Sequence, residues 1–285
     1  MSSLLTNTSA LTALRNLSMT QQSLQSTQNQ ISTGLKVASA ADNASYWSIA
    51  TQMRSDNGAL GAVKDALNTS GALLDTMSAG ITSSIGVMNK IKNNLVAASQ
   101  PGADTAKIAT ELKSLGAQLA SITSASNFNG VNLLDGSAGT TVKFVASFSA
   151  STVGTIDVGT KDLVNAGAGL LDAATAGTTT TDFTDGSADL TSANIADTIK
   201  NADKAISDLT SYAATLGAAR SQVTDQGNFI STLSDSLTKG VSSLVDADMN
   251  EASTKLQALQ TQQQLGVQSL SISNQNTQMI LKLFQ

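Results

Sequence analysis

The sequence contains no histidine and no cysteine. The side chain that most often serves as a general base is therefore missing, and so is the thiol nucleophile. Metal sites built from histidine or cysteine are excluded for the same reason. The glycine pattern at 136–141 lacks the lysine of a phosphate-binding loop. We therefore expect a protein that is not an enzyme, with no catalytic residues, no cofactor and no metal ion.

Proline and aromatic residues are nearly as scarce. A single proline, Pro101, leaves helices almost uninterrupted across 285 residues, of which 3% are aromatic. No apolar run approaches the ~20 residues of a transmembrane helix, and the N-terminus lacks the basic and apolar segments of a signal peptide. A net charge of −5 argues against nucleic acid as a partner. We expect a mainly α chain with neither a nucleic-acid nor a membrane partner.

What the sequence does contain is a heptad pattern, first in residues 47–99. An apolar residue recurs at every seventh position, and a neighbouring row holds Val63, Met77 and Ile91 with Ser70 and Ser84 between them. This spacing is typical of a coiled coil. It predicts one long helix from about Trp47 to Ser99, a turn at Pro101 and Gly102, and a return helix from Ile108 to Ile122. The main row is Leu60, Leu67, Leu74, Ile81, Met88 and Leu95.

A second heptad follows in residues 191–245 and changes frame at its end. From Val245 a new row continues towards the C-terminus, which is the pattern of a four-residue stutter. One continuous helix and two separate helices are equally compatible with this frame shift. The nearby carboxylates Asp246 and Asp248 resemble part of a calcium loop, but no complete loop follows, and helix capping is the simpler role. The main row up to the shift includes Ile195, Leu209, Leu216, Val223, Ile230 and Leu237.

The two ends of the chain also carry heptads, but with almost no charge. From residue 1 to 41 the only charged side chains are Arg15 and Lys36, and from 252 to 285 they are Lys255 and Lys282. A free coiled coil normally carries Glu and Lys beside its apolar rows. Uncharged helices can pack on several copies without burying unpaired ions, so we expect the two ends to fold together on assembly. The expected contact residues are Leu14, Leu17, Gln21, Leu24, Gln28, Ile31, Leu256, Leu259, Gln263, Leu270, Ile280 and Phe284.

The middle of the chain has a different pattern. Asn129-Gly130 and Asp135-Gly136 flank short apolar pieces, which is a hairpin signal. Residues 137–190 are rich in Gly, Ser and Thr with short alternating pieces such as Thr141–Val145, so we expect a few β-strands in a small surface domain. Because this insert lies far from both termini in the sequence, the chain should fold back through it and form a long rod.

Several motifs, in order, closely resemble bacterial flagellins. Residues 24–56 are similar to the N-terminal signature of that family, and 126–134 (SNFNGVNLL) resembles its F-N-G-x-x-L-L motif. Residues 216–223 (LGAARSQV), 243–275 and the ending ILKLFQ (280–285) resemble its C-terminal region, in the form typical of short α-proteobacterial flagellins. The resemblance covers about 1–136 and 191–285.

The resemblance implies a filament subunit for swimming motility, exported unfolded through the flagellar type III system and located in the extracellular flagellum. Its implied fold is mainly α, an elongated antiparallel coiled-coil rod of N- and C-terminal helices with a small β-containing insert at the far end. Implied partners are other flagellin subunits, hook-associated and cap proteins, the export apparatus and a secretion chaperone. The implied domains are an inner core (1–33 and 246–285), a connector (34–46), a rod (47–136, ending in a β-hairpin, and 191–245) and a variable surface domain (137–190).

One alternative within the family is the hook–filament junction protein, which shares the terminal pattern. The close match at 243–285 argues against it. Flagellins recognised by the vertebrate innate receptor carry an arginine-rich stretch with a glutamate in the first long helix, whereas residues 89–96 here read NKIKNNLV. We therefore expect receptor recognition to be weak or absent.

The chain's only tryptophan, Trp47, directly follows the connector, next to Tyr46 at the connector's end. The small residues before them should allow close packing between subunits, and Asp42 or Asn43 should cap the long helix. Tyr46 and Trp47 are expected to anchor the connector to the rod. The connector residues singled out are Gly34, Ala38, Ala40, Ala41, Asp42 and Asn43.

Overall fold

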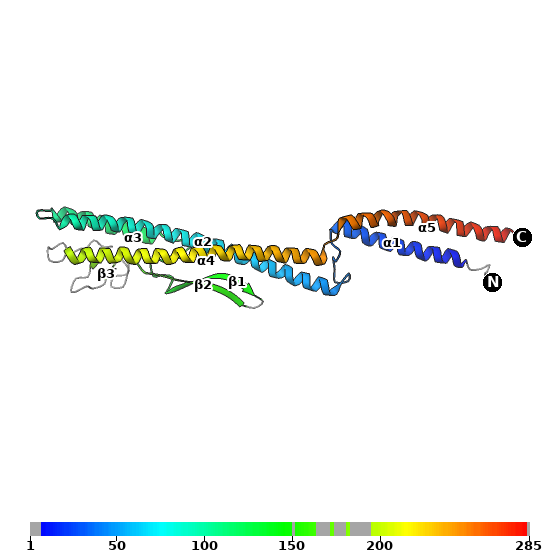
Figure 1. Ribbon diagram of the computed structural model, residues 1–285, viewed down its shortest axis with the longest axis horizontal. Helices are drawn as coiled ribbons and strands as arrows, with labels where there is room; N and C mark the ends of the chain where they lie inside the picture. Colours follow the sequence, from blue (N-terminus) through cyan, green and yellow to red (C-terminus); the bar gives the residue numbers. More distant parts are fainter. Residues whose placement is uncertain (1–6, 150–151, 164–171, 174–180, 183–194, 284–285) are drawn as a thin grey trace. The chain divides into compact units, whose positions relative to one another are not determined.

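The structure is a computed structural model that describes residues 7–149, 152–163, 172–173, 181–182 and 195–283. Within this part the chain forms five helices and two small antiparallel sheets (Figure 1), which confirms the expectation of a mainly α chain with a small β component. No described helix is long and apolar enough to cross a membrane. The helices are α1 (Thr8–Thr33), α2 (Ala44–Ala98), α3 (Thr105–Ala125), α4 (Ile195–Val245) and α5 (Met249–Leu283); the strands are β1 (Thr141–Ser149), β2 (Thr152–Gly159), β3 (Asp172–Ala173) and β4 (Thr181–Asp182).

The chain divides into two compact units. One is built from two separate stretches of sequence and the other from a single continuous stretch. The first unit consists of Met1–Asn57 and Asp235–Gln285, and the second of Gly58–Ser234. Helices α2 and α4 each contribute to both units. We describe the two units in turn and call them the terminal unit and the central unit.

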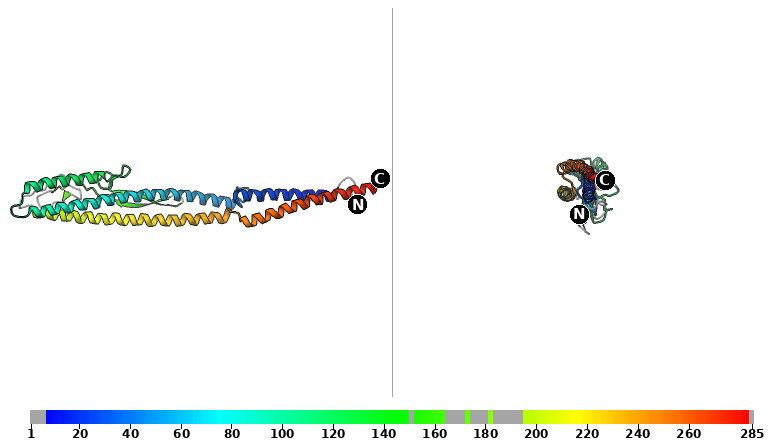
Figure 2. Two further views of the ribbon diagram at one scale, coloured as in Figure 1. Left: turned by 90° about the horizontal axis from the view of Figure 1, so that it is seen from above. Right: turned by 90° about the vertical axis from the view of Figure 1, so that its right-hand side faces the viewer.

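In the terminal unit α1 pairs with α5 in antiparallel fashion (Figures 1 and 2). At one end of the pair Asn7 caps α1 through the Ala10 amide and donates from Nδ2 to the Ser273 carbonyl, 3.2 Å away. At the other end Gly34 ends α1 with φ of 72°, a left-handed conformation that favours glycine. Its carbonyl accepts a hydrogen bond from the Ala247 amide at 2.9 Å, so the segments that follow α1 and precede α5 are joined.

In the central unit α2 and α4 lie side by side and antiparallel (Figure 2). Three polar contacts mark the register: Lys64 with Ser231, Asp75 with Arg220, and Lys92 with Asp203. The residue numbers of each pair add to the same value, as expected for two antiparallel helices with one register. The segment that follows α3 approaches α2 closely at Gly80, where an added Cβ would meet Ser126 Oγ at 2.2 Å and Leu134 Cδ1 at 3.2 Å.

The segment 126–134 that joins α3 to the sheet is a tight turn with one pair of backbone hydrogen bonds, between Phe128 and Val131. Asn129 and Gly130 both have positive φ, 51° and 82°, as a two-residue primed turn requires. The expected β-hairpin at this place is therefore reduced to a single bridge. The buried amide of Asn132 donates to the Thr123 carbonyl and accepts from the Leu134 amide, which ties the turn to α3.

The β1–β2 hairpin confirms the expectation of strands in the insert. The two strands pair from Thr141 with Gly159 to Ser149 with Thr152, with a bulge between Val145 and Ser147. The hydroxyl of Tyr212 on α4 donates to the Gly159 carbonyl at 3.0 Å and holds the end of β2. Because the Tyr212 side chain is buried, desolvation raises its pKa to about 12. Most of residues 164–190 of the expected surface domain lie outside the described residues, and so do residues 191–194 of the expected rod.

Two helix boundaries bear on the expectations from the sequence. The start of α2 differs from the expected position, and the end of α4 decides between one continuous helix and two separate helices. Helix α2 begins at Ala44 rather than at Trp47, because Asn43 accepts a hydrogen bond from the Tyr46 amide and caps the helix. The frame shift at Val245 marks two separate helices. The Asp248 carboxylate accepts from the amides of Asn250 and Glu251, so it has the capping role expected of it.

Candidate assembly surfaces

The side of α1 that faces α5 shares one row of residues with the expected contact residues and differs from them in the second row. Leu17, Leu24 and Ile31 are half-buried, as the pattern placed them. The second inward row, however, is Ala13, Thr20 and Thr27, and Thr27 is only 1% exposed. Its hydroxyl is satisfied by the Ser23 carbonyl at 2.9 Å, so a threonine fits the interior. Leu14, Gln21 and Gln28, which are also among the contact residues expected from the sequence, do not face α5 within the chain: all three side chains are exposed.

The reason is geometric. A row three residues before Leu17 and a row three residues after it flank the leucine row on opposite sides. Each of these rows contains polar residues at two of three positions, so the sequence of α1 does not distinguish them. The position of α5 makes the choice, and it leaves Leu14 55% exposed on the outer side.

The inward row of α5 agrees with the sequence pattern. Leu256, Gln263 and Leu270 are half-buried, and Leu259 is 8% exposed. Gly266 lies on the same side, and a Cβ there would be 3.3 Å from Leu17 Cδ1, which shows how closely α1 approaches α5. The side chains of Ile280 and Phe284 lie outside the described residues.

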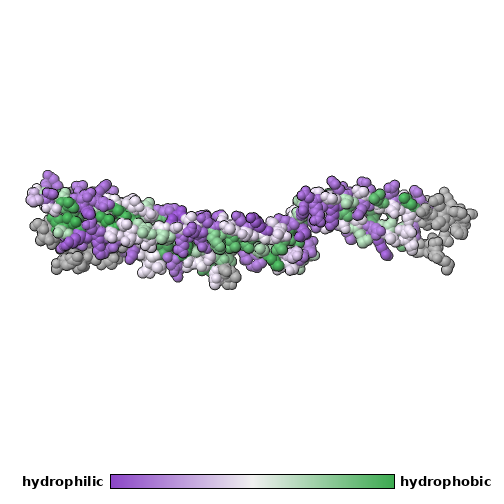
Figure 3. All heavy atoms as spheres, in the orientation of Figure 1, coloured by the Kyte–Doolittle hydropathy of each residue, from purple (hydrophilic) through white to green (hydrophobic). Residues whose placement is uncertain are grey.

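The outer sides of α1 and α5 expose large apolar side chains with few charged residues near them. In the described part of α1 the only charged residue is Arg15. Residues of intermediate hydropathy cover much of this helix pair on the face seen in Figure 3. A hollow of about 390 Å³ between the two helices is also lined without charge, by residues that include Met19, Ser23 and Gln262. The exposed apolar residues are Leu11, Leu14, Met19, Leu265, Val267 and Ile272.

The connector is held by backbone contacts that the sequence did not indicate. The amides of Lys36 and Val37 both donate to the Val245 carbonyl at the end of α4, at 2.7 and 3.2 Å. Val37 is 4% exposed and packs in a small cluster with Ala50, Val241 and Val245. The small residues Ala38, Ala40 and Ala41, by contrast, are exposed.

Asp42 organises the loop rather than capping α2. Its carboxylate accepts hydrogen bonds from the amide and hydroxyl of Ser39 and from the Ala38 amide, at 2.9 to 3.1 Å. These bonds, chiefly those from Ser39, stabilise the charged form and hold the pKa of Asp42 below its ordinary value. Of the two expected caps, Asn43 is the one that caps the helix.

Tyr46 and Trp47 do not lie where the sequence led us to expect. They are 42% and 38% exposed, so neither is an anchor buried between the connector and the helices of its own chain. Ile49, two residues after Trp47, is 47% exposed.

The residues expected in the rod core lie inside the helix pairs. Apart from Leu237, which is half-buried, each is at most 6% exposed. They come together in two antiparallel rows, one on α2 and one on α4. These residues are Leu60, Leu67, Leu74, Ile81, Met88, Leu95, Ile195, Leu209, Leu216, Val223 and Ile230.

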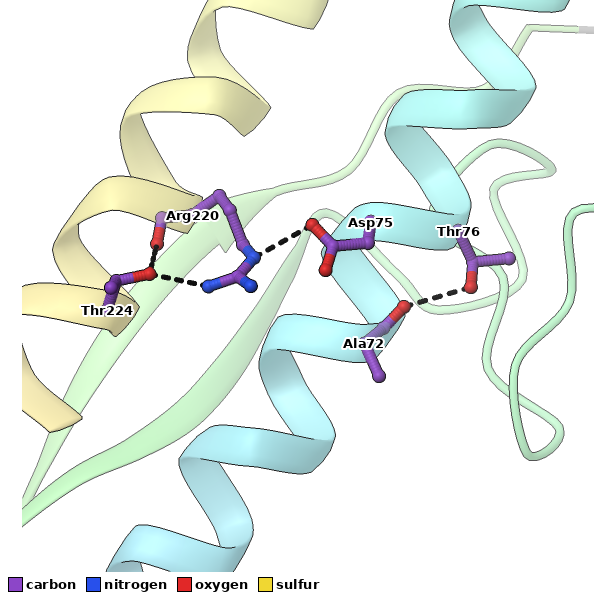
Figure 4. A network of polar contacts seen from close by, with 5 residues as sticks. All are labelled: Ala72, Asp75, Thr76, Arg220 and Thr224. Atoms are coloured by element: carbon purple, nitrogen blue, oxygen red, sulfur yellow. Dashed lines mark hydrogen bonds and ion pairs between the residues drawn. The ribbon is translucent and has the colours of Figure 1, made fainter.

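The polar contacts at the edge of this core are exposed. Arg220 of α4 reaches across to Asp75 of α2, with Nε 2.8 Å from Oδ1, and Thr224 accepts a second hydrogen bond from the guanidinium (Figure 4). The hydrogen bond to Asp75 raises the pKa of Arg220. Both side chains are about half exposed, so solvent screens the pair. No group of three or more Asp, Glu, His or Cys that could hold a metal ion occurs among the described residues.

Comparison with known proteins adds the family. The model of the bacterial flagellin N-terminal helical region matches residues 4–139, and that of the C-terminal helical region matches 199–284. Flagellin C of Rhizobium meliloti is 42% identical and a flagellin of Brucella melitensis is 46% identical, each over the full length of both chains. A crystal structure of Bacillus cereus flagellin aligns with a TM-score of 0.44 at 20% identity, over 58% of this chain and 88% of that one.

Proposed function

The chain belongs to the bacterial flagellin family, and from this premise we propose that the paired helices α1 and α5 form the surface through which its copies pack in the filament. As a flagellin it is a structural subunit and not an enzyme, and it polymerises with copies of itself into the extracellular flagellar filament. Nothing in the comparisons favours the hook–filament junction protein.

The observation that carries the proposal is the outer side of the α1–α5 pair. Six large apolar side chains on it are 51–60% exposed: Leu11, Leu14, Met19, Leu265, Val267 and Ile272. Exposed apolar groups of this kind mark interaction sites when they gather on one element. Because the copies each carry a net charge of −5, packing is least opposed where charged side chains are absent.

The same proposal assigns each segment of the chain to a part of the filament. Residues 1–33 and 246–285 form the inner core of the filament, 34–46 the connector, 47–136 and 191–245 the surrounding rod, and 137–190 the surface domain. Contacts that repeat head to tail without closing produce a helical tube. Export through the flagellar type III apparatus, a secretion chaperone, and hook-associated and cap proteins complete the proposed set of partners.

Removal of α1 tests the proposal. The full chain is heated to give monomers and repolymerised, and a variant lacking residues 1–33 is treated identically. We expect filaments from the full chain in electron micrographs and none from the variant. Circular dichroism of the variant should still show a cooperative unfolding transition from the central unit.

A matched pair of point variants makes the test finer. Leu14→Lys places a charge on the outer side of α1, whereas Asn16→Lys places the same charge two residues away at the hollow's edge, outside the apolar set. We expect Leu14→Lys to impair assembly more strongly. Filaments from the truncated chain, or equal assembly of the two point variants, would contradict the proposed role of α1.

A further inference from the structure

The first turns of α2 carry the densest group of exposed apolar side chains among the described residues. Tyr46, Trp47 and Ile49 lie within four consecutive positions and are 42%, 38% and 47% exposed. In a chain with 3% aromatic residues, two adjacent aromatic side chains at the surface are unusual. We call Tyr46 and Trp47 the aromatic patch; Ile49, three residues after Tyr46, lies beside Tyr46 at the edge of the patch, on the other side of the helix from Trp47.

The aromatic patch is exposed because α2 extends beyond its partner helix. Ala50 is 1% exposed and packs with Val241 and Val245, the last of which ends α4. Since α2 and α4 are antiparallel, residues before Ala50 extend past the end of α4. Tyr46 and Trp47 stand four and three residues before Ala50, so they lie on the same face of α2, one turn further. The inward face of α2 thus continues for a turn that no helix in the described part of the chain covers.

The surroundings of the aromatic patch favour a second copy of this chain as the partner. No charged residue occurs from Asn43 to Met53. Two copies that each carry a net charge of −5 repel each other, and an uncharged stretch is where they can approach closely. Tyrosine and tryptophan are also the residues most enriched at the centres of protein interfaces, because one end of each ring is apolar and the other can bond to a polar group.

We infer that the aromatic patch is a contact between copies of this chain, separate from the α1–α5 surface, and that the next copy covers Trp47 in the filament. The inference rests on the proposed filament function and adds to it a second surface at the start of α2. A helix of the neighbouring copy takes the place above Tyr46 and Trp47 that α4 leaves open.

Trp47 itself reports on this contact, because it is the only tryptophan in the chain. The emission of the full, unmodified chain is recorded as heat-dissociated monomer and after repolymerisation, with electron microscopy of the same samples. Loss of water around the indole should shift the emission to shorter wavelength and reduce quenching by acrylamide. Filaments in which Trp47 stays as strongly quenched as in the monomer would overturn the inference and leave the proposed function standing. Absence of filaments would contradict the proposed function as well.

Two neighbouring charge insertions separate the patch from a general effect of charge. Ile49→Lys places a charge beside Tyr46, at the edge of the patch, and Ser48→Lys places the same charge on an exposed position of the opposite face of α2 from Ala50. Truncating or disrupting a central interface residue costs enough to raise the critical concentration for assembly about tenfold or more. We expect this rise for Ile49→Lys and little change for Ser48→Lys.

Circular dichroism of both monomers checks that α2 is intact. Equal inhibition by the two lysines would assign the effect to added charge and not to the aromatic patch. Normal assembly of Ile49→Lys would also count against the contact. Trp47→Phe, which keeps an aromatic ring at the site, should assemble almost as well as the unmodified chain.

Discussion

The α2–α4 pair of the central unit and the α1–α5 pair of the terminal unit follow the same seven-residue period but bury different amounts of side chain. In α2, Leu74, Met77, Ile81 and Met88 are at most 1% exposed. In α1, the one buried residue among those described is Thr27. Periodicity therefore specifies that two helices pair, whereas the size of the side chains in the rows specifies how much stability the pair has in a single chain.

The difference has a functional meaning in a subunit that must polymerise. Burial of apolar area provides most of the stabilisation of a folded domain. The central unit places its leucines inside, so it is stabilised without partners. The terminal unit leaves apolar residues such as Leu14 and Leu265 exposed, and in the proposed function other copies cover them.

The largest effect is expected from truncating matched leucines in the two units. Leu74→Ala removes a side chain that is 1% exposed, and such changes cost about 2–5 kcal/mol of the free energy of unfolding. Leu24→Ala, in the half-buried row of α1, should cost the monomer less than half as much. Urea unfolding of both monomers measures the difference. Equal losses would show that the terminal unit is packed as well as the central one.

A smaller effect is expected from glycines in the two units. A Cβ on Gly80 would lie 2.2 Å from Ser126 Oγ and 3.2 Å from Leu134 Cδ1. Gly80→Ala should therefore destabilise the monomer by about 1–3 kcal/mol, as overpacking does. Gly266→Ala meets only the end of Leu17, at 3.3 Å, and should have a much smaller effect.

Gly86→Ala is the control for helix propensity. It lies in α2 with open space around its Cβ position, so the replacement should stabilise the helix by about 0.5–1 kcal/mol. Thermal unfolding of the three variants tests the order. If Gly80→Ala were as stable as Gly86→Ala, the close approach of Ser126 and Leu134 to α2 would be wrong.

The exposed ion pair on the central unit should contribute less again. Because Asp75 and Arg220 are about half exposed, their coupling energy is expected to be within about 0–1 kcal/mol. A double-mutant cycle with Asp75→Asn and Arg220→Gln measures it, and added salt should reduce it further. A coupling of several kcal/mol would mean that this pair is shielded from water.

The smallest effect concerns Asp42 in the terminal unit. Its folded pKa is below the ordinary value of 3.8, so its stabilising contribution is complete above pH 3.8 and is lost as the pH falls through the lower folded value. Titration of the Asp42 carboxyl by NMR checks the direction of the shift. Asp42→Asn should weaken the pH dependence of unfolding below 3.8, and a midpoint at or above 3.8 would contradict the bonds from Ser39 and Ala38.

Much of the fold could be predicted from the sequence where the rows contain large apolar residues. The rows through Leu60 and Leu95 on α2 and through Leu209 and Ile230 on α4 are buried as the spacing indicated. Prediction was weaker where rows contain small or polar residues, since Thr20 and Thr27 are inward and Gln21 and Gln28 are not. The close contact at Gly80 and the bond from Tyr212 to β2 join segments far apart in the sequence, and no local pattern indicates them.

Tyr46 and Trp47 illustrate the difference between features that the local sequence predicts and features that packing between distant segments determines. The helices, their seven-residue period and the nearly uncharged ends could be read from the sequence, because these depend on residues a few positions apart in the chain. Packing determined which row of α1 faces α5, that Asn43 and not Asp42 caps α2, and that Tyr46 and Trp47 lie beyond the end of α4 and are exposed. Each of these depends on where a second helix begins or ends, and that position is determined by packing between distant segments.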